Sequence, residues 1–175
     1  SIERRSARTA LYQILSTLVR IIAPVLSFTA EEAYQLLPWE KKESVFLEDW
    51  PEERAPDMKL LDKWERFFEI RKQVLKKIEE KREEKIIGSG LEAKVIIKGD
   101  RETVEFLQGL EGLAGLLIVS EVVISSGDTF DITVEKTLFG KCQRCWVHFP
   151  EIGTPEAPEI CFKCQQVLKD DGIHN

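Results

Sequence analysis

The first part of the chain places apolar side chains with the period of an α-helix. Over residues 6–22 these side chains recur three or four positions apart, so one face of the expected helix is apolar throughout. They are Ala7, Leu11, Ile14, Leu15, Leu18 and Ile22. Pro24 ends this helix, because a proline ring removes an amide proton and clashes with the preceding turn.

A second helix is expected directly after that proline. Thr29 followed by Glu32 has the spacing of a capping box, in which each side chain satisfies an amide group at the helix start. Pro38 ends the apolar pattern of this helix. The tryptophans and prolines of residues 38–56 predict an ordered loop that packs back onto the two helices.

A long helix is expected over residues 57–87. Its apolar stripe consists of Leu60, Trp64, Phe67, Phe68, Val74, Leu75 and Ile78. Its far end is almost wholly charged, and the run 76–85 is either a solvated face with weak ion pairs or a face that contacts phosphates. The side chains chosen to test phosphate contact are Arg71, Lys72, Lys76 and Lys77. Gly88 and Gly90 then end the helix.

Beyond Gly90 the apolar period shortens to that of a strand. Residues 91–98 alternate, residues 116–124 are apolar, and residues 129–135 alternate again. Asp100 can cap a short helix that follows the first of these segments. Short strands around a helix predict a small α+β unit with a mostly antiparallel sheet.

The strongest chemical signal is a set of four cysteines near the C-terminus, which are the only cysteines in the chain. Cys142, Cys145, Cys161 and Cys164 form the pattern C-x2-C-x15-C-x2-C. A two-residue spacer lets both thiolates of one turn face the same ion, and tetrahedral Zn²⁺ takes four such ligands at roughly 2.3 Å. Because the protein supplies all four ligands, we expect one structural zinc ion and no catalytic metal.

Other uses of these cysteines remain open at this stage. A rubredoxin-type iron site would need the same four ligands, and a redox dithiol would need one C-x-x-C near a βαβ pattern. A disulfide scaffold would need an oxidising compartment, whereas the N-terminus is charged where a signal peptide would be apolar. His148 and His174 are spare imidazoles, and we interpret both as surface residues.

Together the patterns predict a multi-unit, mainly α protein. We expect a helical region over residues 1–88, a small α+β unit over 89–138 and a zinc finger with four cysteine ligands over 139–175. The hydrophobic share of 43% and the charged share of 32% are typical of a soluble globular chain. Arg20 interrupts the longest apolar stretch, so no membrane partner is expected and a cytoplasmic location is favoured.

Charge restricts how a nucleic acid could be bound. The net charge is −6, yet residues 57–85 carry 10 basic and 8 acidic side chains, so any contact must be a local patch. The chain contains no Gly-rich phosphate loop, no G-x-S-x-G and no H-E-x-x-H, so no catalytic site is expected in it. Its first residue is Ser1, which is compatible with a piece of a longer polypeptide.

Four sequence blocks carry a family resemblance. They are SARTALYQILSTLVRIIAPVLSFTAEEAYQLLP, ESVFLEDWPE, IGSGLEAKV and KCQRCWVHFPEI…PEICFKC. In this order they resemble the C-terminal portion of bacterial isoleucyl-tRNA synthetases, over essentially the whole chain. The first block is shared in outline with related class I synthetases, whereas the last two point to the isoleucine enzyme. The terminal finger also resembles that of formamidopyrimidine-DNA glycosylases.

The resemblance implies a helical-bundle anticodon-binding region, a small α/β appendix and a zinc finger. Such a region would hold the anticodon arm of isoleucine tRNA beside the remaining domains of the synthetase. ATP and isoleucine would bind outside this chain, because the class I signatures HIGH and KMSKS are absent from it. We expect a monomer that makes no contact with DNA. The alternative is a zinc-stabilised structural or interaction module that does not touch RNA.

Several side chains around the zinc ligands suit the recognition of unpaired bases. Proteins read such bases by stacking them on aromatic or guanidinium planes and by hydrogen bonding to their edges. The candidate tRNA contacts are Lys141, Arg144, Trp146, His148 and Lys163, together with Arg71, Lys72 and Lys76 of the long helix. Trp146 has a second interpretation, as a core residue that covers the metal site.

Overall fold

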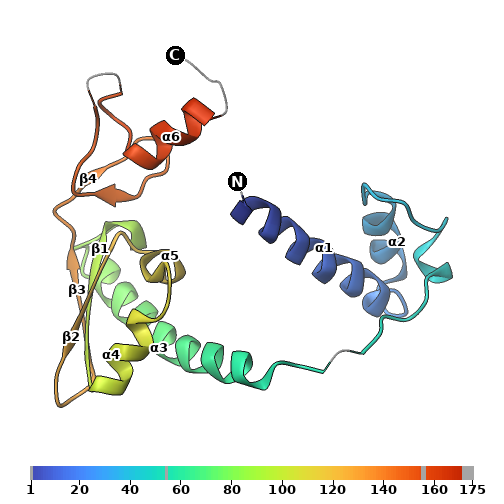
Figure 1. The fold of residues 1–175 in the computed structure, drawn as a ribbon, viewed down its shortest axis with the longest axis horizontal. Helices are drawn as coiled ribbons and strands as arrows, with labels where there is room; N and C mark the ends of the chain where they lie inside the picture. The colour runs from blue at the N-terminus through green and yellow to red at the C-terminus, as the bar shows by residue number, and fades with distance from the viewer. Residues whose placement is uncertain (1, 54, 155–156, 171–175) are drawn as a thin grey trace. The chain divides into compact units, whose positions relative to one another are not determined.

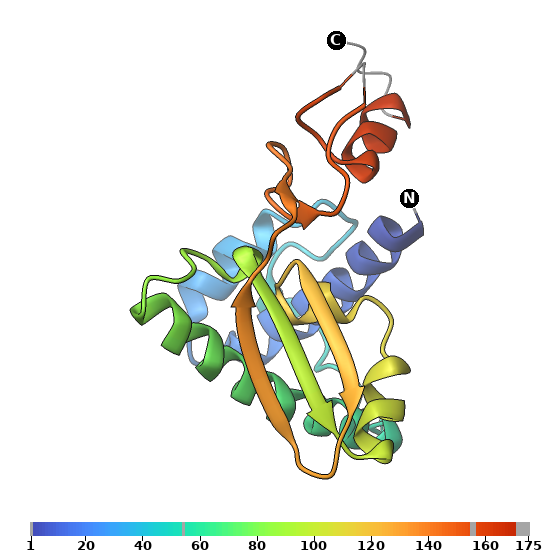
Figure 2. The same cartoon turned by 90° about the vertical axis from the view of Figure 1, so that its left-hand side faces the viewer.

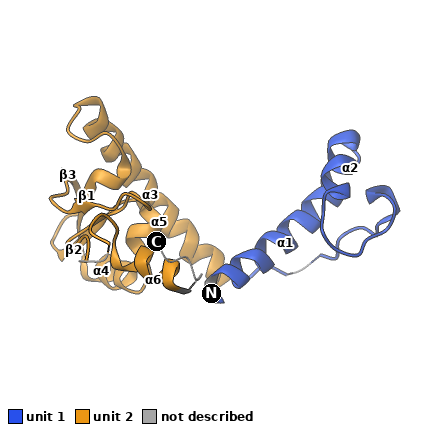
Figure 3. Ribbon diagram, turned by 90° about the horizontal axis from the view of Figure 1, so that it is seen from above, with its two compact units in different colours: residues 1–57 blue, residues 58–175 orange. Residues whose placement is uncertain are grey.

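The computed structural model describes residues 2–53, 55–154 and 157–170 (Figure 1). The chain divides into two compact units, Ser1–Asp57 and Met58–Asn175, which Figure 3 shows in different colours. Among the described helices, none is long and apolar enough to span a membrane.

The first unit contains two α-helices and a short 3₁₀ helix. They are α1 (Ile2–Ile22), α2 (Ser27–Gln35) and η1 (Val45–Leu47). Their core consists of Val19, Ala23, Ala30, Tyr34, Leu37 and Val45. The prediction that Thr29 caps α2 is wrong, because the helix begins two residues earlier, and no side-chain cap is found at its described start. Pro24 ends α1 at Ile22, and α2 begins three residues after this proline.

Most of the apolar face of α1 is exposed. We call Ala7, Leu11, Ile14, Leu18 and Ile21 the α1 apolar stripe. The stripe residues lie three or four positions apart, and all are exposed, whereas Val19 and Ala23 enter the core. The sequence pattern therefore predicted the helix correctly, but most of its apolar face is not buried by the described part of this unit.

Polar contacts hold the loop after α2 in place, as the punctuated sequence predicted. The Tyr34 hydroxyl donates a hydrogen bond to the Glu48 carboxylate. The Glu31 carboxylate accepts hydrogen bonds from the Ser44 hydroxyl at 2.8 Å and from the Val45 amide at 3.0 Å. Because Val45 is itself buried, these bonds and the small apolar core stabilise the same segment.

The second unit is built on a three-stranded sheet with helices on one side. Its strands are β1 (Ala93–Gly99), β2 (Glu121–Ser126) and β3 (Asp131–Lys136). Its helices before the zinc finger are α3 (Met58–Glu83), α4 (Arg101–Gln108) and α5 (Leu113–Leu117). The central strand β1 is parallel to β2 and antiparallel to β3 (Figure 2). The sheet is thus mixed, not mostly antiparallel as expected, because α4 and α5 carry the chain back before β2 begins.

One face of the sheet forms the main core. Val95 and Ile97 of β1 are fully buried and lie beside Val134 and Ile132 of β3. Phe67 of α3 belongs to the same cluster, and Figure 1 shows α3, α4 and α5 on one side of the sheet. Alternation along β1 turns the remaining side chains to the opposite face, which stays partly exposed.

The run 116–124, expected as one strand, is divided by a turn. Its first residues complete α5, and Ile118 then takes a left-handed conformation with φ of 58° before β2 starts. A short apolar run is compatible with a buried helical turn as well as with a strand, which explains the error. At Gly90 a Cβ would lie 2.9 Å from the Ile118 carbonyl oxygen, so the backbones can approach here only because of the glycine.

Two further expectations can be compared with the packing. The cap at Asp100 is confirmed, since its carboxylate accepts a 2.9 Å hydrogen bond from the Thr103 amide. Helix α3 packs on β3, so it lies in the same compact unit as the sheet, whereas the predicted division grouped it with the first two helices in residues 1–88. Sequence periodicity shows that a helix has an apolar face but does not show which neighbour covers it.

Candidate zinc centre and nucleic-acid interface

A short hairpin forms the first half of the cysteine site. Strand β4 (Gly140–Lys141) pairs with β5 (His148–Phe149). Between them the Cys142 amide donates to the Val147 carbonyl at 3.0 Å, and the Trp146 amide donates to the Cys142 carbonyl at 2.9 Å. These bonds close a tight turn that directs Cys142 and Cys145 to one point.

The second half of the site lies at the start of α6 (Phe162–Asp170). Cys161 immediately precedes this helix, and Cys164 lies in its first turn. The Gln143 amide donates a 3.0 Å hydrogen bond to the Glu159 carbonyl and so joins the two halves. Backbone pairing therefore brings together two C-x-x-C turns that are far apart in the sequence.

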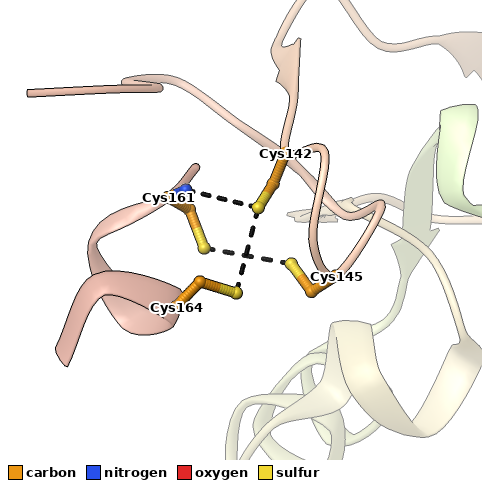
Figure 4. Close-up of side chains that lie close together, drawn as sticks. All are labelled: Cys142, Cys145, Cys161 and Cys164. Carbon is orange, nitrogen blue, oxygen red and sulfur yellow. Dashed lines mark hydrogen bonds between the residues drawn. The ribbon is translucent and has the colours of Figure 1, made fainter. Parts of the chain in front are cut away.

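The four sulfur atoms have the arrangement of a metal site. All four Sγ atoms lie within 4.8 Å of one another. Cys142 and Cys164 are separated by 3.9 Å between sulfurs, as are Cys145 and Cys161 (Figure 4). A tetrahedron with Zn–S bonds of roughly 2.3 Å has edges of about 3.8 Å, so the donor set fits one zinc ion.

The electrostatics of the thiols also favour a bound cation. Burial opposes ionisation of Cys142, but backbone N–H groups, including that of Cys161, outweigh it and lower the pKa of this thiol to about 6. The Cys161 amide lies 3.3 Å from the Cys142 sulfur. Burial and the neighbouring sulfurs raise the pKa of Cys145 to about 12. A divalent cation overcomes this opposition to ionisation, because it stabilises four adjacent thiolates together.

The apolar core of the finger is small. Cys142, Cys161 and Cys164 are buried, and the side chains packed against them are Phe149, Ile152 and Ile160. Cys145 is the one exposed ligand of the four. The finger contains one structural zinc ion, and its ligands take the place that a larger apolar core would occupy.

Trp146 directly follows the second ligand and points away from the core. Its side chain is 61% exposed, so it does not cover the metal site. The Lys141 ammonium lies 4.9 Å from the centre of its ring, a cation–π contact. Arg144 and Lys163 are also exposed and flank the ligands in sequence. The finger thus presents an exposed indole in contact with Lys141.

Trp146 also has a backbone conformation that sequence reasoning missed. Its φ is 65°, in the left-handed region that glycine adopts without cost and other residues rarely adopt. The turn imposes this angle, because the Trp146 amide must return to the Cys142 carbonyl. No local signal in the sequence could have indicated it, because glycine and asparagine mark this region and a bulky residue does not.

The other predicted contacts have different surroundings. His148 is partly buried, its amide donates to the Ser120 hydroxyl at 2.8 Å, and its Nδ1 is buried, so it belongs to the junction with the α+β unit. The Arg71 Nε donates to the Leu116 carbonyl at 3.2 Å, a contact within the fold. Lys72 and Lys76 are exposed on α3, which is separate from the finger. His174 lies outside the described residues.

The fold and the site define a protein with a helical region, an α+β unit and a structural zinc finger that displays aromatic and cationic groups. Residues 1–97 match the family described as the anticodon-binding domain of tRNA ligase. Residues 139–167 match the family described as the zinc finger found in FPG and IleRS. The chain therefore belongs to the tRNA ligase family that carries this anticodon-binding domain.

Similar curated proteins are isoleucine–tRNA ligases. That of Carboxydothermus hydrogenoformans is 42% identical over 181 residues, which cover 96% of this chain and 20% of the relative. That of Natranaerobius thermophilus is 39% identical over 95% of the chain and 20% of the relative. That of Staphylococcus carnosus is 40% identical over 96% and 20%. The chain thus spans about a fifth of the length of these relatives.

Proposed function

We propose that this chain is the C-terminal, tRNA-binding part of an isoleucyl-tRNA synthetase. It holds the anticodon arm of isoleucine tRNA while ATP-dependent ligation of isoleucine takes place in domains outside this chain. The family match over residues 1–97 and the isoleucine–tRNA ligase relatives support the assignment. The observation that carries the RNA contact is the exposed ring of Trp146 on the zinc finger.

The surface around Trp146 suits unpaired RNA. An anticodon loop presents bases whose faces are free, and an exposed indole offers a stacking surface for one of them. Lys141 and Arg144 are close to Trp146 in the sequence, and the Lys141 ammonium contacts the indole ring. Their positive charges offset the net negative charge of a zinc ion with four thiolate ligands, which would otherwise repel phosphates.

The conformation of Trp146 supports a role in recognition. A left-handed backbone angle costs a residue other than glycine on the order of 1 to 2 kcal/mol. The exposed ring recovers little of that cost by burial. Glycine would therefore be the better residue for the turn alone, so a tryptophan here is explained by a partner that its ring contacts.

Binding at this site would act on catalysis only through placement. Holding the anticodon arm orients the tRNA acceptor end in a distant active site and lowers the entropic cost of the reaction. The α1 apolar stripe supports contact with the remaining domains of the synthetase, since contiguous exposed apolar faces commonly mark interfaces. We propose that the protein works as a monomer in the cytoplasm and binds neither membranes nor DNA.

The same stripe supports the second candidate, an interaction module that pins neighbouring domains and does not touch RNA. The salt dependence of binding distinguishes the two functions. Phosphate contacts release counterions, so RNA binding weakens steeply as salt rises, whereas apolar docking depends on salt much less.

The test is a titration of the zinc-loaded chain with the anticodon stem-loop of isoleucine tRNA at two salt concentrations. A shuffled stem-loop and a DNA duplex serve as controls. We expect selective binding to the native stem-loop that weakens with salt. Equal binding to both RNAs, or no binding with zinc present, would refute the proposed role of this chain.

A pair of variants ties the result to the site. Trp146→Gly should keep zinc and the finger fold, because glycine suits the backbone angle, yet weaken RNA binding by about 1 to 3 kcal/mol. Phe162→Ala removes another ring from the same finger, 74% exposed, and should leave binding unchanged. If Trp146→Gly loses zinc, the ring has a structural role and the stacking proposal fails.

A further inference from the structure

A groove runs along one side of α1 in the first unit. Two cavities of about 250 and 610 Å³ share Tyr12, Ser16 and Arg20, which are spaced four residues apart on the helix. Trp39 lines the smaller cavity and Trp50 the larger. We call the site lined by Tyr12, Ser16, Arg20 and Trp50 the α1 groove.

The α1 groove and the α1 apolar stripe lie on opposite sides of the helix. With about 100° of rotation per residue, the mean directions of the two sets differ by about 180°. A protein domain that covers the stripe therefore leaves the groove open. The helix can serve an interface and a ligand site at the same time.

Arg20 places a fixed positive charge in the groove. Its Nε donates to the Ser16 carbonyl at 2.8 Å, one Nη to the Ser16 hydroxyl at 3.2 Å and the other to the Asp49 carbonyl at 3.3 Å. All three acceptors are neutral, and among the described residues no carboxylate lies within ion-pair distance of this guanidinium. Glu48 interacts with Arg20 through charge alone, so a guanidinium held by neutral acceptors can still donate to a phosphate group.

Aromatic rings supply the second element of the groove. The Trp50 side chain is 66% exposed although it lines the cavity. The Tyr12 ring meets Trp39 edge to face, with centroids 4.6 Å apart and planes at 74°. An exposed indole beside an oriented tyrosine offers stacking area for a planar group, as single-strand binding sites do.

The acidic residues nearby limit the number of phosphate groups that the groove can accept. Asp49 and Glu52 line the larger cavity, and Glu40 and Glu48 line the smaller. The Asp49 carboxylate is neutralised by Lys42 at 3.1 Å. A run of several phosphates would meet the remaining negative charges, so the groove suits one phosphate at Arg20 and a neutral ring on Trp50.

We propose that the α1 groove binds a single unpaired nucleotide of the RNA. The base stacks on Trp50, the phosphate accepts a hydrogen bond from Arg20, and Gln13 and Thr17, which also line the cavity, contact the base edge or ribose. This inference rests on the proposed RNA-binding function and adds a second contact on a different unit from the zinc finger.

The test measures binding of the full chain to the anticodon stem-loop over a series of salt concentrations. We expect Trp50→Ala to weaken binding by on the order of tenfold, without changing the slope of log affinity against log salt. Arg20→Gln should reduce that slope by about 0.7 to 0.9, the share of one phosphate contact. Circular dichroism and thermal melting verify that each variant is folded.

Matched variants separate recognition from a structural effect. Trp50→Phe keeps a stacking ring and should restore most of the binding. Phe28→Ala removes a ring that is 92% exposed in the same unit but outside the groove, and it should bind like the parent chain. If Trp50→Ala fails to fold, photocrosslinking of the parent chain to a bromouridine-substituted stem-loop replaces it, with the crosslink expected in the tryptic peptide 43–54.

The outcomes distinguish this inference from the proposed function. If Trp146→Gly loses binding while Trp50→Ala and Arg20→Gln do not, the groove proposal is overturned and the zinc-finger contact stands. If crosslinks fall only in the zinc finger, the groove proposal fails in the same way. If the parent chain binds no RNA at all, both proposals are overturned together.

Discussion

The α+β unit, which includes α3 and spans residues 58–138, and the zinc finger are held together by different interactions. The core of the α+β unit contains fifteen buried apolar residues. They lie on or near α3, α4, α5 and the three strands. In the finger, the buried cluster consists of three cysteines, with Phe149, Ile152 and Ile160 packed against it. The first region can stabilise itself by burial, whereas the second has too little apolar surface to do so.

This difference shows why metal and apolar core can replace each other. Burial contributes free energy in proportion to area, so a segment of fewer than about 40 residues rarely gains enough from it. A structural zinc ion contributes on the order of 10 kcal/mol through four bonds and needs only four correctly placed side chains. Loss of a zinc ligand and loss of a core side chain should therefore affect separate regions.

The largest expected effect is that of Cys161→Ser. Because zinc ligation and folding are one event in such modules, the finger should lose its metal and unfold while the α+β unit stays intact. Zinc content together with hydrogen exchange over residues 93–136 and 140–170 measures this. Phe162→Ser, at the neighbouring exposed position, should change neither. Unchanged metal content and unchanged protection of the finger in Cys161→Ser would contradict the claim that zinc ligation holds the finger together.

A core substitution should produce the reverse pattern. Phe67 is 1% exposed, and Phe67→Ala should lower the free energy of unfolding of the α+β unit by about 3 to 5 kcal/mol. Its neighbour Phe68 is 56% exposed on the same helix, so Phe68→Ala should cost much less. Chemical denaturation followed by fluorescence checks both variants. Equal losses for the two would mean that the packing of α3 described above is wrong.

The first unit has a small core, so its polar network should matter more. Tyr34→Phe removes a hydrogen bond to a carboxylate and should cost about 1.5 to 3 kcal/mol. Tyr12→Phe changes an exposed hydroxyl and should cost far less. Thermal melting of both variants at neutral pH is the measurement. A Tyr34→Phe variant as stable as the parent would mean that this hydrogen bond does not stabilise the first unit.

The same pair predicts how stability depends on pH. Burial and the contact with Glu48 raise the pKa of Tyr34 from 10.0 to about 12. The stabilisation from the protonated hydroxyl is therefore complete below pH 10 and is lost as pH rises toward 12. The hydrogen bond from Tyr34 lowers the pKa of Glu48, so its contribution is present above pH 4.5 and is lost as pH falls below that value. Tyr34→Phe should flatten both limbs of the stability profile.

The smallest expected effect concerns a helix cap within the α+β unit. Asp100→Ala removes the acceptor for the Thr103 amide and should cost about 1 kcal/mol. Asp100→Asn keeps a capping oxygen and should be nearly neutral. A loss as large as that of Phe67→Ala would show that the cap supports more than the start of α4, and urea denaturation of the three variants decides it.

Local rules predicted the elements whose signals lie within a few residues. Pro24, the cap at Asp100 and the two C-x-x-C turns each act through their own neighbours in the chain, and all three predictions are confirmed. The rule failed at residues 116–124, where a helical turn and a strand can carry the same apolar run. It also failed at Thr29, because the backbone turn after Pro24 started α2 earlier than the capping signal.

By itself the sequence determined most of the helical and extended segments, the four zinc ligands and the family resemblance, because each depends on spacing along the chain. Only the tertiary structure decided which apolar faces are buried and which side chains are available to a partner. It buries Phe67 and exposes Phe68, holds Arg71 within the fold and turns Trp146 outward. Burial depends on what packs across from a residue, and that neighbour comes from a distant part of the chain that periodicity does not identify.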